Sequence, residues 1–311
     1  MTKTSSTRLP HRRPLTPEWP TLLLFLACLV ALSIGVWGLP HLSTLAAFAL
    51  TTLALVLHAS LTHEILHGHP FRSRRASEAL AWINPGLAIP YLRFRDTHLA
   101  HHQDANLTDP YDDPESNYLD PARWAQMPGW LRALRRVNNT LAGRMLIGPA
   151  LGQAAFMADD LARIRGGDRQ VLQGWLWHLP GAVLVLWAVM AAPMPLWLYL
   201  AACYAALAIL KIRTFLEHQA HDAPRGRTVV IEDRGPLAFL FLNNNLHMVH
   251  HMHPRVAWYR LPGIYRTNRD RYLRRNDGYV YSGYAEIFGR YFWRAKDPVP
   301  HPLWPREGKA R

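Results

Sequence analysis

The sequence predicts an all-α integral membrane protein with four transmembrane helices in two hairpins and a cytoplasmic helical cap that carries clustered histidines. The chain of 311 residues is half hydrophobic and only 18% charged, and its 35 basic residues are unevenly placed. No lysine or arginine occurs between Arg13 and Arg72, or between Arg169 and Lys211. Each of these stretches has room for two helices of about 20 apolar residues, the length that crosses a bilayer.

Four apolar segments fit the length of a membrane span. They are residues 21–39, 42–61, 171–192 and 195–210. Short turns at Pro40 and Pro193 join them in two pairs, which we expect to be helical hairpins. Pro180 interrupts the third segment, where neighbouring helices can satisfy the backbone groups that a proline frees.

Basic residues flank the outer ends of both pairs of segments, and the two turns carry none. The flanking residues are Arg12, Arg13, Arg72, Arg74, Arg75, Arg163, Arg165, Arg169, Lys211 and Arg213. By the positive-inside rule, both termini and the middle region face the cytoplasm. We expect one domain over residues 1–311, in the inner or plasma membrane of a bacterium. Residues 79–92 are apolar but too short to span, so we expect an interfacial or re-entrant segment there.

Composition also excludes several classes of protein. The net charge of +13 would suit nucleic acid, but the basic residues flank apolar spans, where lipid headgroups account for them, so we expect no nucleic-acid partner. Cys28 and Cys203 are too few for a disulfide framework or a cysteine zinc site. The first 18 residues are polar and precede an apolar run too long for a cleavable signal peptide, so we expect none.

Eight of the 17 histidines fall into three boxes. The boxes are HEILH (His63, His67), HLAHH (His98, His101, His102) and HMVHH (His247, His250, His251). On a helix, spacings of three and four residues put the imidazoles on one face. Each box lies just beyond an apolar segment on the predicted cytoplasmic side, so we expect all eight to converge at one depth.

The number of these histidines indicates two metal ions. Imidazole suits iron, zinc, copper or nickel, so ligand type alone does not name the metal. A catalytic zinc takes three protein ligands and a water, and eight histidines exceed that. Redox-active iron also accounts for a site at a membrane face, where oxygen and lipid substrates both concentrate.

In these boxes the chain resembles the membrane fatty acid desaturase family, with its related hydroxylases and ketolases. The resemblance runs from the first hairpin through His253 and rests on three boxes in the family's order. That family takes one more ligand from a histidine shortly after the second hairpin. Here RTFLEHQAH supplies His218 at the matching place, with His221 as the alternative. Thr214 stands where acyl-CoA desaturases have an asparagine, which argues against that branch.

The resemblance implies a membrane-bound, non-haem di-iron oxidase that uses two Fe ions (Fe²⁺/Fe³⁺) and O₂ to desaturate a fatty-acyl or similar lipid chain. A hydroxylase or ketolase of the same class, acting on a lipid or carotenoid, is the alternative. The sequence has no flavin fingerprint, haem-attachment motif or cysteine cluster. We therefore expect electrons from a separate donor such as a ferredoxin, a rubredoxin or a cytochrome with its reductase.

Carboxylates near the boxes are candidates to orient the ligands, because metal-bound imidazoles usually donate their other N–H to a carboxylate, carbonyl or water. The candidates are Glu64, Asp96, Glu217 and Asp222. The acidic run TDPYDDPES, with Asp109, Asp112, Asp113 and Glu115, indicates instead a solvated loop, because its prolines force turns. His69 and His253 are interpreted as ordinary polar histidines.

Two further interpretations concern the first box and the basic residues. HEILH matches the H-E-x-x-H motif, so an intramembrane zinc protease with Glu64 as base is a rival, although it leaves both other boxes unexplained. The cluster Arg132, Arg135, Arg136 and the run 266–275 suit either anionic lipid headgroups or an acidic electron carrier.

Overall fold

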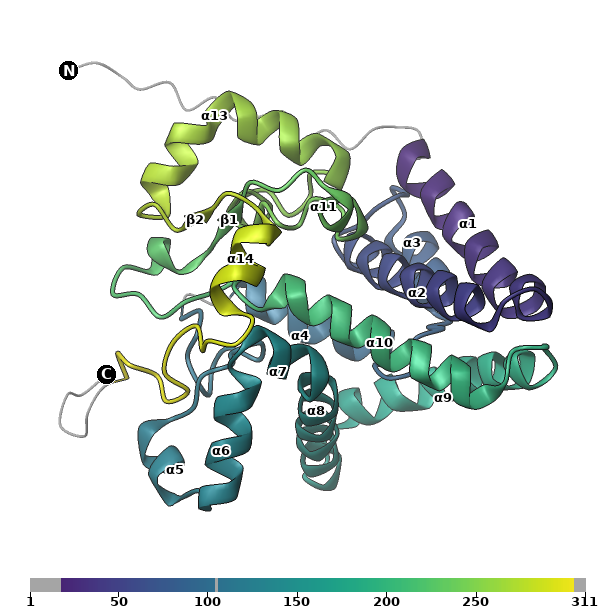
Figure 1. Ribbon diagram of the computed structural model, residues 1–311, viewed down its shortest axis with the longest axis horizontal. Coiled ribbons are helices and arrows are strands. Elements are labelled where there is room, and N and C mark those ends of the chain that lie inside the picture. The colour runs from purple at the N-terminus through teal and green to yellow at the C-terminus, as the bar shows by residue number, and fades with distance from the viewer. Residues whose placement is uncertain (1–17, 104–105, 305–311) are drawn as a thin grey trace.

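The computed structural model describes residues 18–103 and 106–304, and this part of the chain is mostly helical (Figure 1). The α-helices are α1 (Trp19–Ser33), α2 (Thr44–Leu66), α3 (Arg74–Ala81), α4 (Tyr91–Gln103), α5 (Pro121–Gln126), α6 (Gly129–Asn138), α7 (Leu141–Leu146), α8 (Gly148–Arg165), α9 (Arg169–Met190), α10 (Leu196–Thr214), α11 (Pro236–Leu240), α12 (His247–Met252), α13 (Leu261–Arg275) and α14 (Tyr284–Tyr291). Shorter helical turns are η1 (Ile34–Gly38), η2 (Leu39–His41), η3 (Pro224–Arg227) and η4 (Trp258–Arg260). The strands are β1 (Val230–Ile231) and β2 (Val280–Tyr281).

Four helical segments are long and apolar enough to cross a membrane, as the sequence predicts. They are Trp19–His41, which joins α1 to η1 and η2, Thr44–Leu66, Arg169–Met190 and Leu196–Thr214. The second and fourth run past their predicted ends at residues 61 and 210. Hydropathy falls where polar residues begin, whereas a helix continues as long as its residues tolerate helical geometry, as His63 and Lys211 do.

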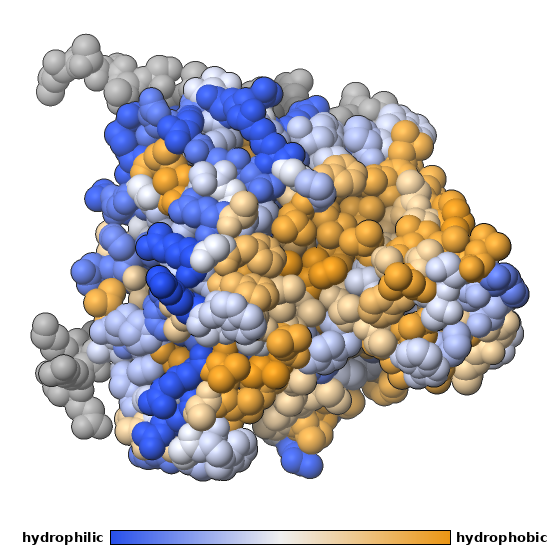
Figure 2. Space-filling model, viewed as in Figure 1, coloured by the Kyte–Doolittle hydropathy of each residue, from blue (hydrophilic) through white to orange (hydrophobic). Residues whose placement is uncertain are grey.

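Apolar side chains are exposed along these four segments. Leu45 is 76% exposed and Trp197 66%, and Leu23, Val183 and Trp187 are similarly open. Figure 2 shows a largely orange surface over α1, α2, α9 and α10, whereas the opposite end of the molecule is mostly blue. An apolar area of this extent suits contact with lipid. The hairpin topology and the cytoplasmic side stay predictions, and Arg12 and Arg13 lie outside the described residues.

α2 lies at the centre of the packing between these helices. It packs most extensively on α10 and α1, and also contacts α3 and α4. Gly35 permits one close approach, since a Cβ at that position would lie 2.5 Å from the hydroxyl oxygen of Thr51 on α2. The contact of α2 with α10 is apolar, with Leu55, Val56 and Ala202 all buried in one cluster.

The predicted short apolar segment, residues 79–92, does not span. It forms the end of α3, an irregular loop and the start of α4. Side chains of two spans satisfy its backbone, since the Tyr199 hydroxyl donates to Pro85 O at 2.7 Å and His178 Nε2 to Leu87 O at 2.8 Å. Irregular backbone is tolerated at membrane depth where the protein satisfies it in this way. The re-entrant or interfacial position of this loop stays a prediction.

A small parallel sheet corrects the prediction of an all-α fold. Its strands pair Val230 with Val280 and Ile231 with Tyr281. Two residues are too few to produce the alternation of apolar and polar side chains that predicts a strand. The sheet bears on function because β1 and the residue before it hold the segment around α12: Val229 O accepts from Met248 N, and Ile231 N donates to Asn245 O.

A buried ion pair joins α4 to α8 and α9. The Arg93 guanidinium donates to both oxygens of Asp160 at 2.7 to 3.1 Å, and these side chains are 3% and 1% exposed. The Trp175 indole also donates to Asp160, at 2.8 Å. The Arg93 stem lies over Gly174, where a Cβ would come within 3.1 Å of it. This contact fixes the helix that carries the second histidine box.

We expect Asp160→Ala to destabilise the protein by about 3–5 kcal/mol, because it leaves the Arg93 charge buried without a partner. Thermal unfolding in detergent measures the loss as a lower Tm. Asp159→Ala is the matched control, because Asp159 is the exposed neighbour on the same helix, and its change should be close to zero. Equal losses in the two variants would contradict the assigned role of the ion pair.

Candidate metal centre

α2 brings the first histidine box to the polar end of a candidate span. Its N-terminus is capped by the Ser43 hydroxyl, which accepts from Ala46 N. His63 lies in the last turn and His67 at the C-terminal cap, and Gly68, with a φ of 98°, then turns the chain. The two imidazoles lie on one face with their ring centroids 4.9 Å apart.

The second and third boxes lie on α4 and α12. In the C-terminal half of α4, His98 and His101 are 2% and 0% exposed, whereas His102 is half-buried. α12 is only six residues long and depends on its surroundings, chiefly the backbone bonds from Val229 and Leu246. His218 follows the end of α10, and Lys296 Nζ donates to its carbonyl oxygen at 2.9 Å.

The structure brings the nine predicted histidines together in two groups. The five-histidine group is His63, His67, His98, His102 and His250, and the four-histidine group is His101, His218, His247 and His251. Within each group the candidate ligand nitrogens all lie within 4.8 Å of one another. α4 and α12 each contribute to both groups, α2 only to the first and the segment after α10 only to the second.

The spacing of the nitrogens fits ligands of a common ion. In the five-histidine group, Nε2 of His98 lies 3.0 Å from those of His63 and His102. In the four-histidine group, Nε2 of His218 lies 2.9 Å from that of His101 and 3.1 Å from that of His247. Two nitrogens at right angles around a metal at about 2.1 Å are about 3.0 Å apart, which matches these distances.

Hydrogen bonds on the far side of two rings fix their tautomers. Nδ1 of His98 lies 2.8 Å from the Glu115 carboxylate, and Nδ1 of His101 lies 2.8 Å from that of Asp113. An ionised carboxylate only accepts, so each Nδ1 carries a proton and Nε2 is the nitrogen of each ring that can bind a metal. Nε2 of His67 is also buried, and no hydrogen-bond partner for it lies within residues 18–103 and 106–304. Buried lone pairs facing one another are costly without a cation, so the donor set fits a metal.

The pKa values of the histidines and the nearby negative charge also favour a metal ion in these groups. Burial, with neighbouring imidazoles, lowers the pKa of His102 to about 3, and burial beside His101 does the same for His218. Both rings are therefore neutral near pH 7, as a metal ligand must be. Burial alone would lower the pKa of His101, but the Glu115 and Asp113 carboxylates outweigh it and raise that pKa to about 9. The same negative charge attracts a metal cation.

Asp113 and Glu115 correct the prediction that the acidic run is a solvated loop. Asp113 is 4% exposed, and its second oxygen accepts from Thr108 N at 2.8 Å. Thr108 has a φ of 77°, and the tight turns of this run direct both carboxylates toward α4. The sequence signal is weak because a solvated loop also combines prolines with acidic residues. Asp112 is exposed, as expected.

Two of the four predicted carboxylates lie beside the histidines. Glu64 is buried, with one oxygen 3.9 Å from His63 Nδ1, but its other oxygen accepts from Trp258 N at 3.1 Å. Glu217 lies 3.7 Å from His247 Nδ1, and burial raises its pKa. Neither distance to a ring nitrogen is that of a hydrogen bond. The orienting role of both residues stays a prediction.

The other two predicted carboxylates point away from the groups. Asp96 accepts from Arg95 Nε and Gln170 Nε2, at 2.8 and 2.9 Å. It precedes His98 by two positions, and residues two apart on a helix do not share a face. Asp222 is exposed and makes no hydrogen bond or ion pair to a box histidine within the described residues.

Three other histidines lie outside both groups. His221, the alternative to His218, bonds through Nδ1 to the backbone of Ala223, at 3.0 and 3.1 Å. His69 bonds to Glu18 at 2.7 Å. His253 Nε2 lies 2.9 Å from the Tyr272 hydroxyl, a contact considered below. The geometry thus favours His218 over His221 as the ninth ligand.

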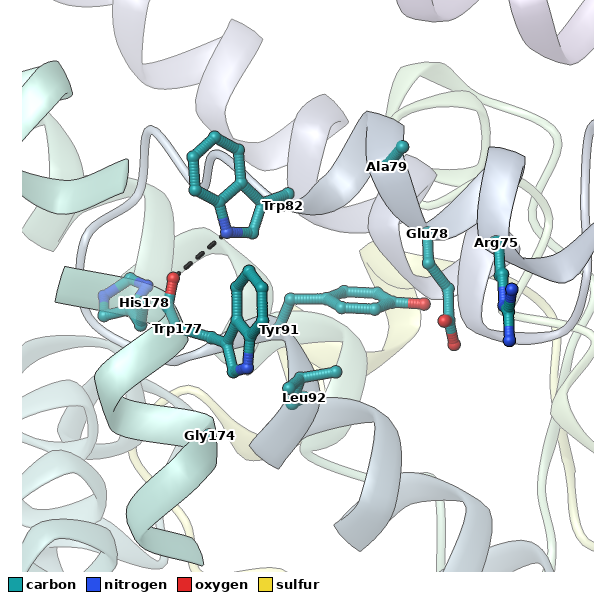
Figure 3. A pocket seen from close by; sticks show the side chains of 9 residues that line it. All are labelled: Arg75, Glu78, Ala79, Trp82, Tyr91, Leu92, Gly174, Trp177 and His178. Carbon is teal, nitrogen blue, oxygen red and sulfur yellow. Dashed lines mark hydrogen bonds between the residues drawn. The ribbon is translucent and has the colours of Figure 1, made fainter. Parts of the chain in front are cut away.

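A hollow of about 470 Å³ lies beside the start of α4, where α3 and α9 meet it (Figure 3). Trp82, Tyr91, Leu92 and Trp177 form its apolar wall, and Glu78 lies at one end, toward which the Tyr91 hydroxyl points in Figure 3. The Trp82 indole donates to the Trp177 carbonyl at 3.1 Å. The hollow therefore lies between a candidate span, α9, and the helix that carries the second box.

Comparison with known proteins agrees with this geometry. The family model described as fatty acid desaturase matches residues 39–283, which include all nine histidines. A beta-carotene ketolase of Paracoccus sp. (strain N81106 / MBIC 01143) is 26% identical over 223 residues, covering 70% of this chain and 75% of the relative. A beta-carotene ketolase of Paracoccus sp. (strain PC1) is 27% identical over 243 residues, covering 73% and 81%.

Metal analysis tests the two groups directly. We expect the protein, purified in detergent after growth with iron, to hold about two iron ions per chain, one for each group. His101→Ala/His250→Ala removes one ligand from each group and should lose most of this iron. His221→Ala is the control and should keep it. A different result would contradict the prediction that each group binds an iron ion: one zinc per chain that remains in the double variant but is lost in His63→Ala.

Asp113→Asn should weaken metal retention by about 10–100-fold, because the carboxylate that orients His101 is replaced by a neutral amide. Competition with a chelator measures this as metal release at lower chelator concentration. Asp112→Asn removes the same charge from an exposed neighbour and should leave retention unchanged. If both variants lost metal retention equally, the cause would be the change in net charge and not the loss of the hydrogen bond between Asp113 and His101.

Proposed function

Because the chain belongs to the fatty acid desaturase family, we propose that it is a membrane-bound, O₂-dependent di-iron oxidase acting on unactivated C–H bonds of a lipid-soluble chain. One observation carries the proposal: two adjoining groups of imidazole nitrogens, each with one ring that is hydrogen-bonded on its far side to a carboxylate. The five-histidine group would hold one iron and the four-histidine group the other. Iron supplies the one-electron chemistry with O₂ that removes hydrogen from such bonds.

We favour insertion of oxygen, as in a hydroxylase or ketolase, over desaturation. Both curated relatives are named beta-carotene ketolases, and each alignment covers most of both chains. A carotenoid or another long apolar chain with a ring end is therefore the first substrate class to test. Desaturation of a fatty-acyl chain is the second candidate, supported by the description of the matching family model.

Both reactions consume the same reductant. Hydroxylation converts R–H, O₂, two protons and two electrons into R–OH and water. A second round at the same carbon gives a geminal diol, which loses water to form the ketone. Desaturation converts a CH₂–CH₂ pair, O₂, two protons and two electrons into a double bond and two waters. In each case two electrons must enter from a separate donor.

The chain's own residues contribute orientation and exclusion of water. Asp113 and Glu115 hold the rings of His101 and His98 in the tautomer that directs Nε2 inward. Near-complete burial of His63, His98 and His101 keeps bulk water from the site. The hollow between α3, α4 and α9 offers an apolar approach from the bilayer.

The proposed topology follows from charge and from the four apolar segments. Both termini and the metal centre face the cytoplasm of a bacterium, because the basic flanks lie at one end of the spans. The zinc-protease alternative has less support. Its base would be Glu64, whose carboxylate instead accepts from the Trp258 backbone, and it leaves seven of the nine grouped histidines without a role.

Product analysis distinguishes the two reactions. Cells that make β-carotene and also express the chain should accumulate carotenoids that have gained oxygen, identified by mass spectrometry, and ¹⁸O₂ should label them. Loss of two hydrogens from membrane fatty acids, with carotenoids unchanged, would identify the desaturase. His250→Ala is the matched negative control. No change in either class of lipid, in cells whose purified protein holds iron, would contradict the proposed substrates.

A further inference from the structure

The outer surface of α13 carries concentrated positive charge. Four of its arginines are exposed and form no ion pair within residues 18–103 and 106–304: Arg266, Arg271, Arg274 and Arg275. Arg269 differs, since it donates to both oxygens of Glu232 at 2.6 and 3.0 Å. Asp270 is the one acidic residue of the helix. We call the four unpaired residues the arginine face.

The inner surface of α13 packs on the third histidine box. Leu261, Tyr265 and Tyr272 are buried in one apolar cluster with Met248 and Val249 of α12. A helix with its side chains is about 10 Å across, so one helix separates the arginine face from a helix that carries candidate ligands.

A series of hydrogen bonds connects α13 to α12. The Tyr272 hydroxyl lies 2.9 Å from His253 Nε2, and the His253 backbone N–H donates to the carbonyls of His250 and Val249, both at 3.0 Å. Tyr272 is 3% exposed, so the route lies in packed protein. An electron tunnels more readily along bonded, packed atoms than across solvent, and this route ends at a member of the five-histidine group.

The position of α13 suits a protein partner better than lipid. In Figure 1 its C-terminal half extends away from α9 and α10, at the end of the molecule opposite the turn between these two helices. Figure 2 shows this region mostly in blue, with one small orange patch, whereas the surface over the candidate spans is largely orange. Lipid headgroups would contact the margin of the apolar surface, whereas the C-terminal half of α13 extends away from it.

We propose that the arginine face docks an acidic one-electron carrier protein of the ferredoxin class and that Tyr272 and His253 form the entry route for its electrons. The inference rests on the proposed function, which requires two external electrons for each O₂ consumed. In each encounter the reduced carrier loses one electron and leaves oxidised, so two encounters complete one round. Complementary charge speeds such encounters and makes them depend on salt.

The basic helix α6 provides a control. It neither packs extensively on a helix that carries a histidine box nor forms a hydrogen bond to one among the described residues. Arg136 lies over the Trp124 ring at 5.5 Å, and Trp130, on the same helix as Arg136, is 70% exposed. Exposed tryptophan together with arginine is typical of a helix at a lipid interface. α6 packs chiefly on α7, which carries no box histidine.

The first test measures binding of a plant-type [2Fe–2S] ferredoxin, an acidic one-electron carrier, to the detergent-solubilised full chain at low and high salt. Arg271→Glu/Arg274→Glu should weaken binding by about tenfold or more at low salt, and this difference should shrink in high salt. Arg132→Glu/Arg136→Glu on α6 makes the same change in charge and should alter binding less than twofold. Binding requires no turnover, so it is read independently of the proposed function.

The second test separates docking from electron entry. Tyr272→Phe removes the hydroxyl that meets His253 and leaves the arginine face intact. Ferredoxin should bind this variant as it binds the wild type but should be reoxidised several times more slowly under anaerobic conditions in stopped flow. Reduction by dithionite, a small diffusible reductant, should keep its wild-type rate. Iron content should be unchanged, since no hydrogen bond or ring contact joins Tyr272 to a grouped histidine in the described part of the chain.

Several outcomes would overturn the inference. Ferredoxin binding that is absent, or equally weakened by both double substitutions, rules out a docking site on α13. Loss of binding of short-chain phosphatidylglycerol in the α13 variant, with ferredoxin binding unchanged, makes the face a lipid anchor. An unchanged reoxidation rate in Tyr272→Phe rules out the route. A chain that binds ferredoxin but holds no iron would instead contradict the proposed function, and the docking site on α13 would still be supported.

Discussion

Nine imidazole nitrogens turned toward one another in a buried space are the constraint on which the rest of this structure depends. Carboxylates bond to the outer nitrogens of His98 and His101, which leaves the inner nitrogens of these two rings as the ones that face their group. Burying imidazole nitrogens that face one another is unfavourable, so the surrounding helices must hold the rings in place. α2 does so by apolar packing on α1 and α10, α4 through Arg93 and Asp160, and α12 through backbone bonds to the segment that begins at Val229.

Much of the centre could be predicted from the sequence, because the helical repeat dictates which side chains share a face. A spacing of three and four residues is sufficient to place His98, His101 and His102 together. It does not determine how they divide between groups. His101 belongs to one group and its neighbour His102 to the other. This division depends on how α4 packs against α12, which the spacing in the sequence does not specify. His218 required a resemblance to a family, because no regular spacing links it to a box.

The errors arose where local pattern and tertiary contact differ. Asp113 and Glu115 lie in a turn-rich acidic run whose composition is that of a solvated loop, and only the folded chain brings them against α4. Asp96 is closer in sequence but faces another way. The spans were predicted well in their apolar parts and poorly at their polar ends, because hydropathy measures transfer to lipid and not the extent of a helix. The two strands are too short to leave a pattern.

The sharing of α4 and α12 between the two groups has a thermodynamic consequence. If each group holds an ion, the first ion to bind would restrain both helices further, since each helix offers it a ligand. The second ion would then meet ligands that are already arranged, and the entropy lost in restraining them would not be lost again. Loading would therefore be cooperative: the uptake curve would be sigmoidal, half-loaded chains would be scarce, and a population starved of metal would divide into empty and complete molecules.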